Sequence, residues 1–200
     1  MQIIVIDATE HKGLTTTMGE KILQGFTRPG DRVENFRLKS MDFSRCIACG
    51  SCDETGECVF EDDASLLYEK LLEADAIVFL SPIYFQSISA LGKCFVDRMQ
   101  ALFSRERLGW KAKKSPYAMA IMSAGAPASP RRFLGAEEVL RTFFIPLGVE
   151  KSVFIGAADT DRDTNLLEEE LQGLGRRLRE ERLCGEVLRK DGSYVFESND

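Results

Sequence analysis

The fold of this 200-residue chain is decided by the stretch Ala76-Ile77-Val78-Phe79-Leu80-Ser81-Pro82-Ile83-Tyr84-Phe85. Its first five residues form an unbroken apolar run, which is typical of a strand buried on both faces of a parallel sheet. Residues 2–7 form a second run of this kind. Both runs lead into small polar residues, as expected where a strand ends. The stretch therefore predicts an α/β protein with a parallel sheet.

Strands and helices alternate on both sides of this stretch. Further strands are expected at 33–38, 117–122 and 149–155, and helices at 16–25, 64–73, 90–103, 131–145 and 164–183. Five strands that alternate with helices make a doubly wound sheet, and right-handed crossovers leave few topologies for it. We predict the strand order 2-1-3-4-5 in a single domain over residues 1–200. A C-terminal extension, about residues 185–200, adds a hairpin at 187–196, because Asp191-Gly192 suits a tight turn.

The loops after strands one, three and four are expected to converge, because ligands of such sheets bind where the strand order reverses. We call them the carboxyl-end loops: residues 7–17, 81–85 and 123–126. The first loop places threonine hydroxyls and backbone N–H groups at the start of a helix, where an anion can bind. An ordinary helix N-cap with turn residues is the alternative. The loop has neither the Walker nor the G-x-G-x-x-G pattern, which disfavours an ATPase or a conventional dinucleotide fold.

Four cysteines fall within thirteen residues, in a stretch of about residues 44–60 that we call the cysteine segment. They are Cys46, Cys49, Cys52 and Cys58. Thiolates at such short gaps, on a loop that contains Gly50 and Gly56, can wrap around one iron-sulfur cube, which takes four cysteine sulfurs. The spacing therefore points to electron transfer.

Three other interpretations of these cysteines stay open. Structural zinc sites usually pair two knuckles across a longer segment, and the single histidine, His11, lies far upstream. Disulfides are uncommon in a reducing cytosol, and the chain opens without a secretory signal pattern, so we expect a cytoplasmic protein. The thiols could also bind nothing and line a surface loop.

Charge and hydropathy disfavour two classes of partner. The formal net charge of −6 argues against a primary role on nucleic acid or an anionic membrane, since both reward clustered Lys and Arg. The one basic cluster, residues 111–114, is short. No apolar run is long enough to span a bilayer.

Three segments resemble the NAD(P)H-dependent FMN reductases, and especially their iron-sulfur flavoprotein branch, all of which are flavodoxin-like. The strongest runs from Ala74-Asp75 through the opening stretch and on to Ser87-Ile88-Ser89-Ala90-Leu91-Gly92-Lys93-Cys94-Phe95-Val96-Asp97-Arg98. The end of the cysteine segment with the residues that follow it, 56–63, is similar to the family's stretch before the second helix. The first carboxyl-end loop matches more loosely. The resemblance covers residues 1–160.

The resemblance implies that the carboxyl-end loops bind FMN. The FMN phosphate would lie against Thr9, His11, Thr15, Thr16 and Thr17. Pro82, Ile83, Tyr84 and Phe85 would lie along the isoalloxazine, and Ser123, Ala124 and Gly125 near its edge. Relatives usually have Gly-Ser-Pro-Arg where this chain has residues 8–11, so a titratable imidazole replaces a cation and weaker or pH-dependent phosphate affinity is expected. Taken alone, Tyr84 and Phe85 could equally be core residues, and 123–126 an ordinary turn.

The resemblance also implies an FMN-dependent oxidoreductase that relays electrons through FMN and a [4Fe-4S] cluster held by the four cysteines. NAD(P)H is the expected donor, with ferredoxin or a quinone as partner. A homodimer or homotetramer is expected, because relatives turn the cysteine segment toward a neighbouring subunit's flavin. No side chain is a convincing acid-base catalyst. The alternatives are a cluster-free NAD(P)H-dependent FMN or quinone reductase and a zinc-stabilised binding module without redox activity.

Overall fold

The computed structural model describes residues 1–165, 167–190 and 193–197. Its strands are β1 (Gln2–Asp7), β2 (Arg32–Arg37), β3 (Ala76–Tyr84), β4 (Ser87–Ile88), β5 (Tyr117–Ser123), β6 (Lys151–Ala157), β7 (Gly185–Lys190) and β8 (Ser193–Glu197). Its α-helices are α1 (Leu14–Phe26), α2 (Ser51–Thr55), α3 (Asp63–Leu72), α4 (Ala90–Arg98), α5 (Gln100–Arg107), α6 (Leu134–Phe144) and α7 (Glu168–Glu181). Two 3₁₀ helices, η1 (Leu38–Ser40) and η2 (Ile145–Leu147), complete the set among these residues.

The sheet has the order β2-β1-β3-β5-β6-β7-β8, and the short β4 pairs with β3. Its first five strands are parallel neighbours in the predicted order 2-1-3-4-5, which is confirmed. The predicted C-terminal hairpin is confirmed, but it extends the sheet beyond the five predicted strands at one edge. There β7 pairs in parallel with β6, and β8 pairs antiparallel with β7. Pairing with β7 removes an exposed edge from β6, while the predicted turn at 191–192 lies outside the described residues.

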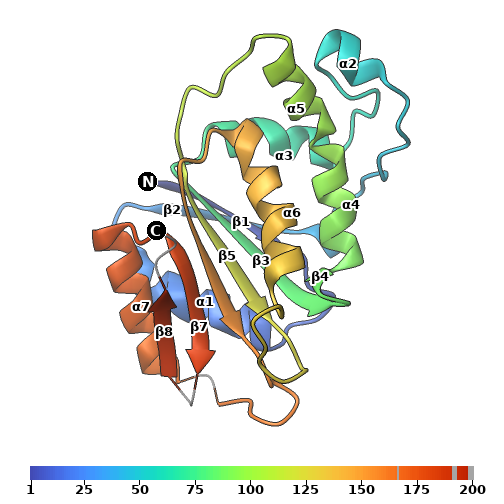
Figure 1. Ribbon diagram of the computed structural model, residues 1–200. Coiled ribbons are helices and arrows are strands. Elements are labelled where there is room, and N and C mark those ends of the chain that lie inside the picture. Colours follow the sequence, from blue (N-terminus) through green and yellow to red (C-terminus); the bar gives the residue numbers. More distant parts are fainter. Residues whose placement is uncertain (166, 191–192, 198–200) are drawn as a thin grey trace.

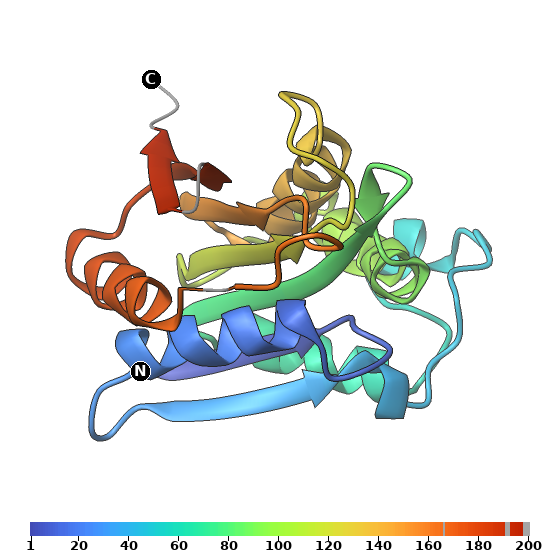
Figure 2. The same cartoon turned by 90° about the horizontal axis from the view of Figure 1, so that it is seen from below.

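Helices cover both faces of this sheet (Figure 1). Side chains of β1 alternate between two cores: Ile3 and Val5 pack on the side of α1 and α7, and Ile4 and Ile6 on the side of α3, α4, α5 and α6. In Figure 2, α1 and α7 lie side by side on their face. The double burial explains why the strands read as continuous apolar runs. Because these strands are parallel, their carboxyl ends lie at one end of the sheet.

The predicted helix over 90–103 is interrupted at Met99, which separates α4 from α5. The Tyr68 hydroxyl donates a hydrogen bond of 2.8 Å to the carbonyl oxygen of Arg98. The Met99 N–H meanwhile bonds to the carbonyls of Val96 and Asp97, which tightens the last turn of α4. A contact from α3 therefore takes the carbonyl that a continuous helix would use, and no local sequence signal announces it.

Three other elements differ from the prediction at their ends. The helix expected over 164–183 begins only at Glu168, because Leu167 takes a left-handed conformation with φ of 48°. The helix expected over 131–145 begins at Leu134 and passes into η2 around Pro146. The strand expected over 149–155 is shifted to 151–157. These shifts leave the strand order and the layers unchanged.

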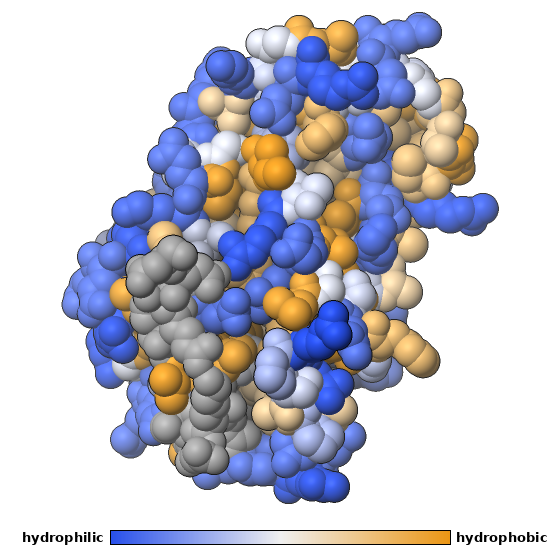
Figure 3. Space-filling model, viewed as in Figure 1, coloured by the Kyte–Doolittle hydropathy of each residue, from blue (hydrophilic) through white to orange (hydrophobic). Residues whose placement is uncertain are grey.

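The surface around α4, α5 and α6 is mainly hydrophilic, with hydrophobic side chains showing between the polar ones (Figure 3). None of the helices in the described part of the chain is long and apolar enough to cross a membrane.

Candidate functional site

Hydrogen bonds join the first two carboxyl-end loops where β1 and β3 end. The Ala8 N–H donates to the carbonyl oxygen of Leu80 over 2.9 Å. The Ser89 hydroxyl donates to the carbonyl oxygen of Ala8 over 2.7 Å, and the Ser89 N–H donates to the Ser81 hydroxyl over 2.9 Å. Ser89, which precedes α4, therefore holds both loops, a role that sequence reasoning missed because a lone serine before a helix is most often only a cap.

The threonines of the first loop face inward in two pairs. Thr15 and Ser123 share a hydrogen bond of 2.6 Å between their hydroxyls, which joins the first loop to the third. Thr9 and Thr16 share one of 3.3 Å. All four side chains are buried. Thr17 lies apart from this group, since its hydroxyl donates to the Gly13 carbonyl within α1.

The start of α1 is open to an anion. Gly13 occupies the N-cap position, so no side chain satisfies the first N–H groups of this helix. Uncapped N–H groups at the positive end of a helix dipole, with hydroxyls beside them, are suited to an anion such as the phosphate expected here. His11 is exposed on the same loop. A lysine from another segment also contacts this loop, since the Lys39 ammonium in η1 donates to the Glu10 carbonyl oxygen over 2.9 Å.

The second loop is a hairpin tip and not an open loop. Strand β3 continues to Tyr84, and a two-residue turn at Phe85 and Gln86, with φ of 48° and 62°, leads back into β4. Tyr84 is 59% exposed and Phe85 is fully exposed at 105%, so the interpretation of these aromatics as core residues is wrong. Pro82 and Ile83 are half-buried below them. The hairpin therefore offers two aromatic faces to a planar ligand.

The third loop approaches the segment that follows β6. Ser123 is the last residue of β5, and the Thr160 N–H donates to the carbonyl oxygen of Ala124. A Cβ atom at Gly125 would lie 2.3 Å from a carboxylate oxygen of Asp161, so any larger residue here requires the exposed Asp161 side chain to shift. Asp161 adds a carboxylate beside the predicted flavin edge, and no pattern in the sequence links it to this loop.

The cysteine segment lies at the other end of α4, at the upper right of Figure 1. The unpredicted helix α2 sits within it, bracketed by Gly50 and Gly56 with φ of 79° and 72°. Cys49 is exposed, while the other three cysteines are half-buried, and none of the four forms a disulfide. All four line one cavity of about 480 Å³. Over residues 1–165, 167–190 and 193–197, no three His, Cys, Asp or Glu side chains are grouped closely enough to hold a metal ion.

The stems of the cysteine segment are held by a buried ion pair that sequence reasoning did not assign. The Arg98 guanidinium donates to both carboxylate oxygens of Asp62, over 2.6 and 3.0 Å, and to the carbonyl oxygen of Ser44 over 2.7 Å. Burial alone would raise the pKa of Asp62, but hydrogen bonds from Arg98 and the Ser44 N–H hold that pKa below its ordinary value. Asp62 also caps α3 by accepting from the N–H groups of Ala64 and Ser65. One carboxylate therefore fixes both the segment and the next helix.

Helix α4 separates the two candidate sites. The Ser89 hydroxyl accepts from the Gly92 N–H at its amino end, beside the carboxyl-end loops. Arg98 is its last residue, beside the cysteine cavity. The nine residues of α4 span roughly 13 Å. The two remaining cysteines take no part in either site: Cys94 is half-buried in α4, and Cys184 is exposed.

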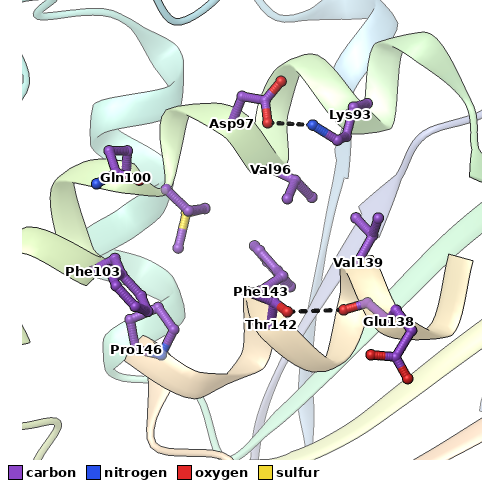
Figure 4. A pocket seen from close by; sticks show the side chains of 11 residues that line it. Lys93, Val96, Asp97, Gln100, Phe103, Glu138, Val139, Thr142, Phe143 and Pro146 are labelled. Carbon is purple, nitrogen blue, oxygen red and sulfur yellow. Dashed lines mark hydrogen bonds and ion pairs between the residues drawn. The ribbon is translucent and has the colours of Figure 1, made fainter. Parts of the chain in front are cut away.

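A further cavity lies between α4, α5 and α6 and contains none of the predicted site residues (Figure 4). Val96, Phe103 and Phe143 contribute apolar walls, and the ion pair of Lys93 with Asp97 lies at its rim. No group in it suggests redox chemistry.

Comparisons with known proteins agree with this architecture. Residues 1–149 match the family described as NADPH-dependent FMN reductase. An iron-sulfur flavoprotein of Archaeoglobus fulgidus is 28% identical over 146 residues, which cover 72% of this chain and 64% of the relative. One of Methanocaldococcus jannaschii is 32% identical over 114 residues, which cover 56% of this chain and 57% of the relative. The chain thus spans less than two thirds of these two relatives, whereas a second Archaeoglobus fulgidus iron-sulfur flavoprotein, 29% identical, is covered to 84%.

Solved structures share the fold. An NAD(P)H:quinone oxidoreductase from Methanothermobacter marburgensis superposes with a TM-score of 0.63 at 19% identity, over 88% of this chain and 95% of that one. An FMN-dependent NADH-azoreductase from Bacillus anthracis in complex with FMN gives a TM-score of 0.64 at 15% identity, over 90% and 100%. The predicted flavodoxin-like fold is confirmed. The chain belongs to the NADPH-dependent FMN reductase family, a family of FMN-dependent oxidoreductases, and its curated relatives carry the name iron-sulfur flavoprotein.

Proposed function

We propose that this protein passes electrons between a reduced donor and an acceptor through FMN at the carboxyl-end loops and a [4Fe-4S] cluster at the cysteine segment. The observation that carries the proposal is the cysteine cavity. Cys46, Cys49, Cys52 and Cys58 line the same space, and no histidine joins them there. Four thiolates without an imidazole are the usual ligand set of an iron-sulfur cube. The relatives named iron-sulfur flavoproteins support this assignment.

FMN would lie across the three carboxyl-end loops. The open start of α1, with Thr9, Thr15 and Thr16 beside it, would bind the phosphate. Thr17 and His11 would stand at the edge of this phosphate site, where they add weaker contacts. Tyr84 and Phe85 would cover one face of the isoalloxazine, above Pro82 and Ile83. Ser123, Ala124 and Gly125 would let the backbone approach the ring edge.

The proposed cofactors would supply the redox chemistry, and the protein would supply binding and orientation. When bound, FMN would supply hydride exchange with NAD(P)H, and a [4Fe-4S] cluster would supply the transfer of one electron at a time. The side chains of this protein would orient and tune these groups, and we expect none of them to act as an acid-base catalyst. We further propose a single FMN-binding domain over residues 1–200, with ferredoxin or a quinone as the partner in electron exchange.

A homodimer or homotetramer would complete the electron path. Within one chain, the length of α4 lies between the carboxyl-end loops and the cysteine cavity. A second subunit that brought its cysteine segment to the exposed Tyr84 and Phe85 would shorten this path. Size-exclusion chromatography with light scattering tests the assembly, and a strictly monomeric, active protein would contradict it.

The decisive experiment is anaerobic purification followed by a visible spectrum and assays for iron, acid-labile sulfide, zinc and released FMN. We expect FMN together with four irons and four sulfides per chain. Flavin without iron or sulfide would leave a cluster-free NAD(P)H-dependent FMN or quinone reductase. A colourless protein with one zinc and no FMN would leave only a zinc-stabilised binding module.

A further inference from the structure

Arg98 is buried completely at the wall of the cysteine cavity, where a cation is unexpected without an anion to match it. Its partner Asp62 balances one unit of charge. Four thiolates and their cluster would bring further negative charge into the same cavity. The position of Arg98 is therefore suited to an anionic ligand larger than one carboxylate.

The hydrogen bonds of Arg98 leave one donor unused. A guanidinium has five N–H groups, and the two terminal nitrogens bond to Asp62, to the Ser44 carbonyl and, at 3.4 and 3.5 Å, to Phe60 and Ser65. The Nε atom is buried and has no partner among the described residues. An unpaired buried N–H is uncommon in folded proteins, because it loses its hydrogen bonds to water without replacement.

We infer that Arg98 is a positioning and tuning residue for an anionic metal centre in the cysteine cavity, which it serves with a fixed positive charge and its unpaired Nε N–H. The inference rests on the proposed function. When such a centre takes up one electron from an external reductant it gains one negative charge, and the guanidinium stabilises that added charge without giving up a proton, because arginine stays protonated. Arg98 should therefore make the centre easier to reduce.

Substitutions of the two partners of this ion pair separate an electrostatic role of Arg98 from a structural one. Arg98→Met removes the positive charge, and Asp62→Asn removes the negative charge that offsets it. Both weaken the same ion pair, so loosening of the segment would move the reduction potential in the same direction in the two variants. If Arg98 acts through its charge, the reduction potential moves downward in Arg98→Met and upward in Asp62→Asn. Arg98→Lys keeps the charge but has a methylene carbon in the place of Nε, so it loses the Nε N–H donor.

Arg105 supplies a matched control on the outside of the same segment. Its Nε donates to the Gly56 carbonyl over 2.9 Å, and its side chain pairs with Glu69. Arg105 does not line the cysteine cavity. Arg105→Met therefore removes an equal charge from α5, beside the segment, without changing the wall of the cavity.

The test is a redox titration with dithionite, in which the metal centre is followed by electron paramagnetic resonance in each anaerobically purified variant. For Arg98→Met we expect the ratio of reduced to oxidised centre at a fixed potential to fall by about tenfold, which is 59 mV for a one-electron couple. Asp62→Asn should shift the reduction potential upward, and the potential of Arg98→Lys should lie between those of wild type and Arg98→Met. Arg105→Met should change the ratio of reduced to oxidised centre by less than about threefold. Retained FMN verifies that each variant is folded.

Equal shifts in Arg98→Met and Arg105→Met, or shifts of the same sign in Arg98→Met and Asp62→Asn, would overturn the inference while the proposed function stands. If Arg98→Met does not fold, the opposite signs expected for Arg98→Lys and Asp62→Asn carry the test. A wild-type protein with FMN but without iron and sulfide would overturn the inference together with the cluster part of the proposed function.

Discussion

The two ends of α4 carry two candidate sites that are built in different ways. At its amino end, regular elements bring together hydroxyls that are buried and already paired with one another, such as Thr15 with Ser123. At its carboxyl end, four thiols line a cavity without being grouped as ligands, in a segment whose stems are held by Arg98 and Asp62. A phosphate site can be preformed by strand ends and a helix start, whereas a cluster site often takes its final shape only with the metal.

Loss of one cysteine is the strongest way to separate the two ends. In Cys49→Ser we expect the iron and sulfide to disappear and the FMN content to stay at one per chain, because the sites lie at opposite ends of α4. Iron, sulfide and flavin assays on anaerobically purified protein measure both. Cys184→Ser, which removes an exposed thiol outside the segment, is the control. Loss of FMN along with iron would break the comparison.

A residue outside both sites tests whether the scaffold itself responds to pH. Burial, together with the nearby Glu186 carboxylate, raises the pKa of Glu137 on α6 to about 7. A raised carboxyl pKa stabilises the folded state fully below the unfolded value, near 4.5, and this stabilisation is lost as the pH rises toward 7. We expect Glu137→Gln to remove this decline and to raise the free energy of unfolding at pH 8 by about 2 kcal/mol.

Chemical denaturation of the apoprotein between pH 4.5 and 8 measures this effect. Glu138→Gln removes an exposed carboxylate that contributes least among the named causes to the raised pKa of Glu137, so most of the decline should remain. An unchanged decline in Glu137→Gln would assign the pH dependence to another group.

Removal of a single hydroxyl should weaken the flavin site alone. Thr15→Val deletes the partner of Ser123 and one donor beside the start of α1. We expect the dissociation constant of FMN to rise about tenfold while iron and sulfide stay unchanged. Fluorescence titration of the apoprotein with FMN measures the constant. Thr142→Val on α6, whose hydroxyl bonds only within its helix, is the control. A parallel loss of iron would show that the two ends are coupled.

The smallest expected effect concerns the exposed histidine of the first loop. His11→Arg places a permanent cation near the predicted phosphate, and we expect FMN to bind about two- to threefold tighter at low salt. The gain should vanish at high ionic strength. His11→Gln, which adds no charge, is the comparison, and equal affinities of the two variants would place His11 away from the phosphate.

Local sequence patterns were enough to predict the parallel sheet and to predict which loops follow the carboxyl ends of its strands. Continuous apolar runs such as 76–80 arise because both faces of each strand are buried, and that property is written into consecutive residues. The C-terminal edge was not predictable in this way. Whether β7 adds to β6 depends on which sheet edge is free, and that is a property of the assembled sheet.

The candidate sites likewise combine features that the sequence predicts with features that depend on tertiary contacts. The sequence by itself determined which groups could do chemistry: the thiol spacing in the cysteine segment, the hydroxyls of the first loop and the aromatics at 84–85. Only the tertiary structure decided that Tyr84 and Phe85 are exposed, that Ser89 ties two loops together, and that Arg98 reaches Asp62 across 36 positions in the chain. The physical reason is that ligand types follow from side-chain chemistry, whereas burial and charge pairing follow from contacts between segments that are distant in the sequence.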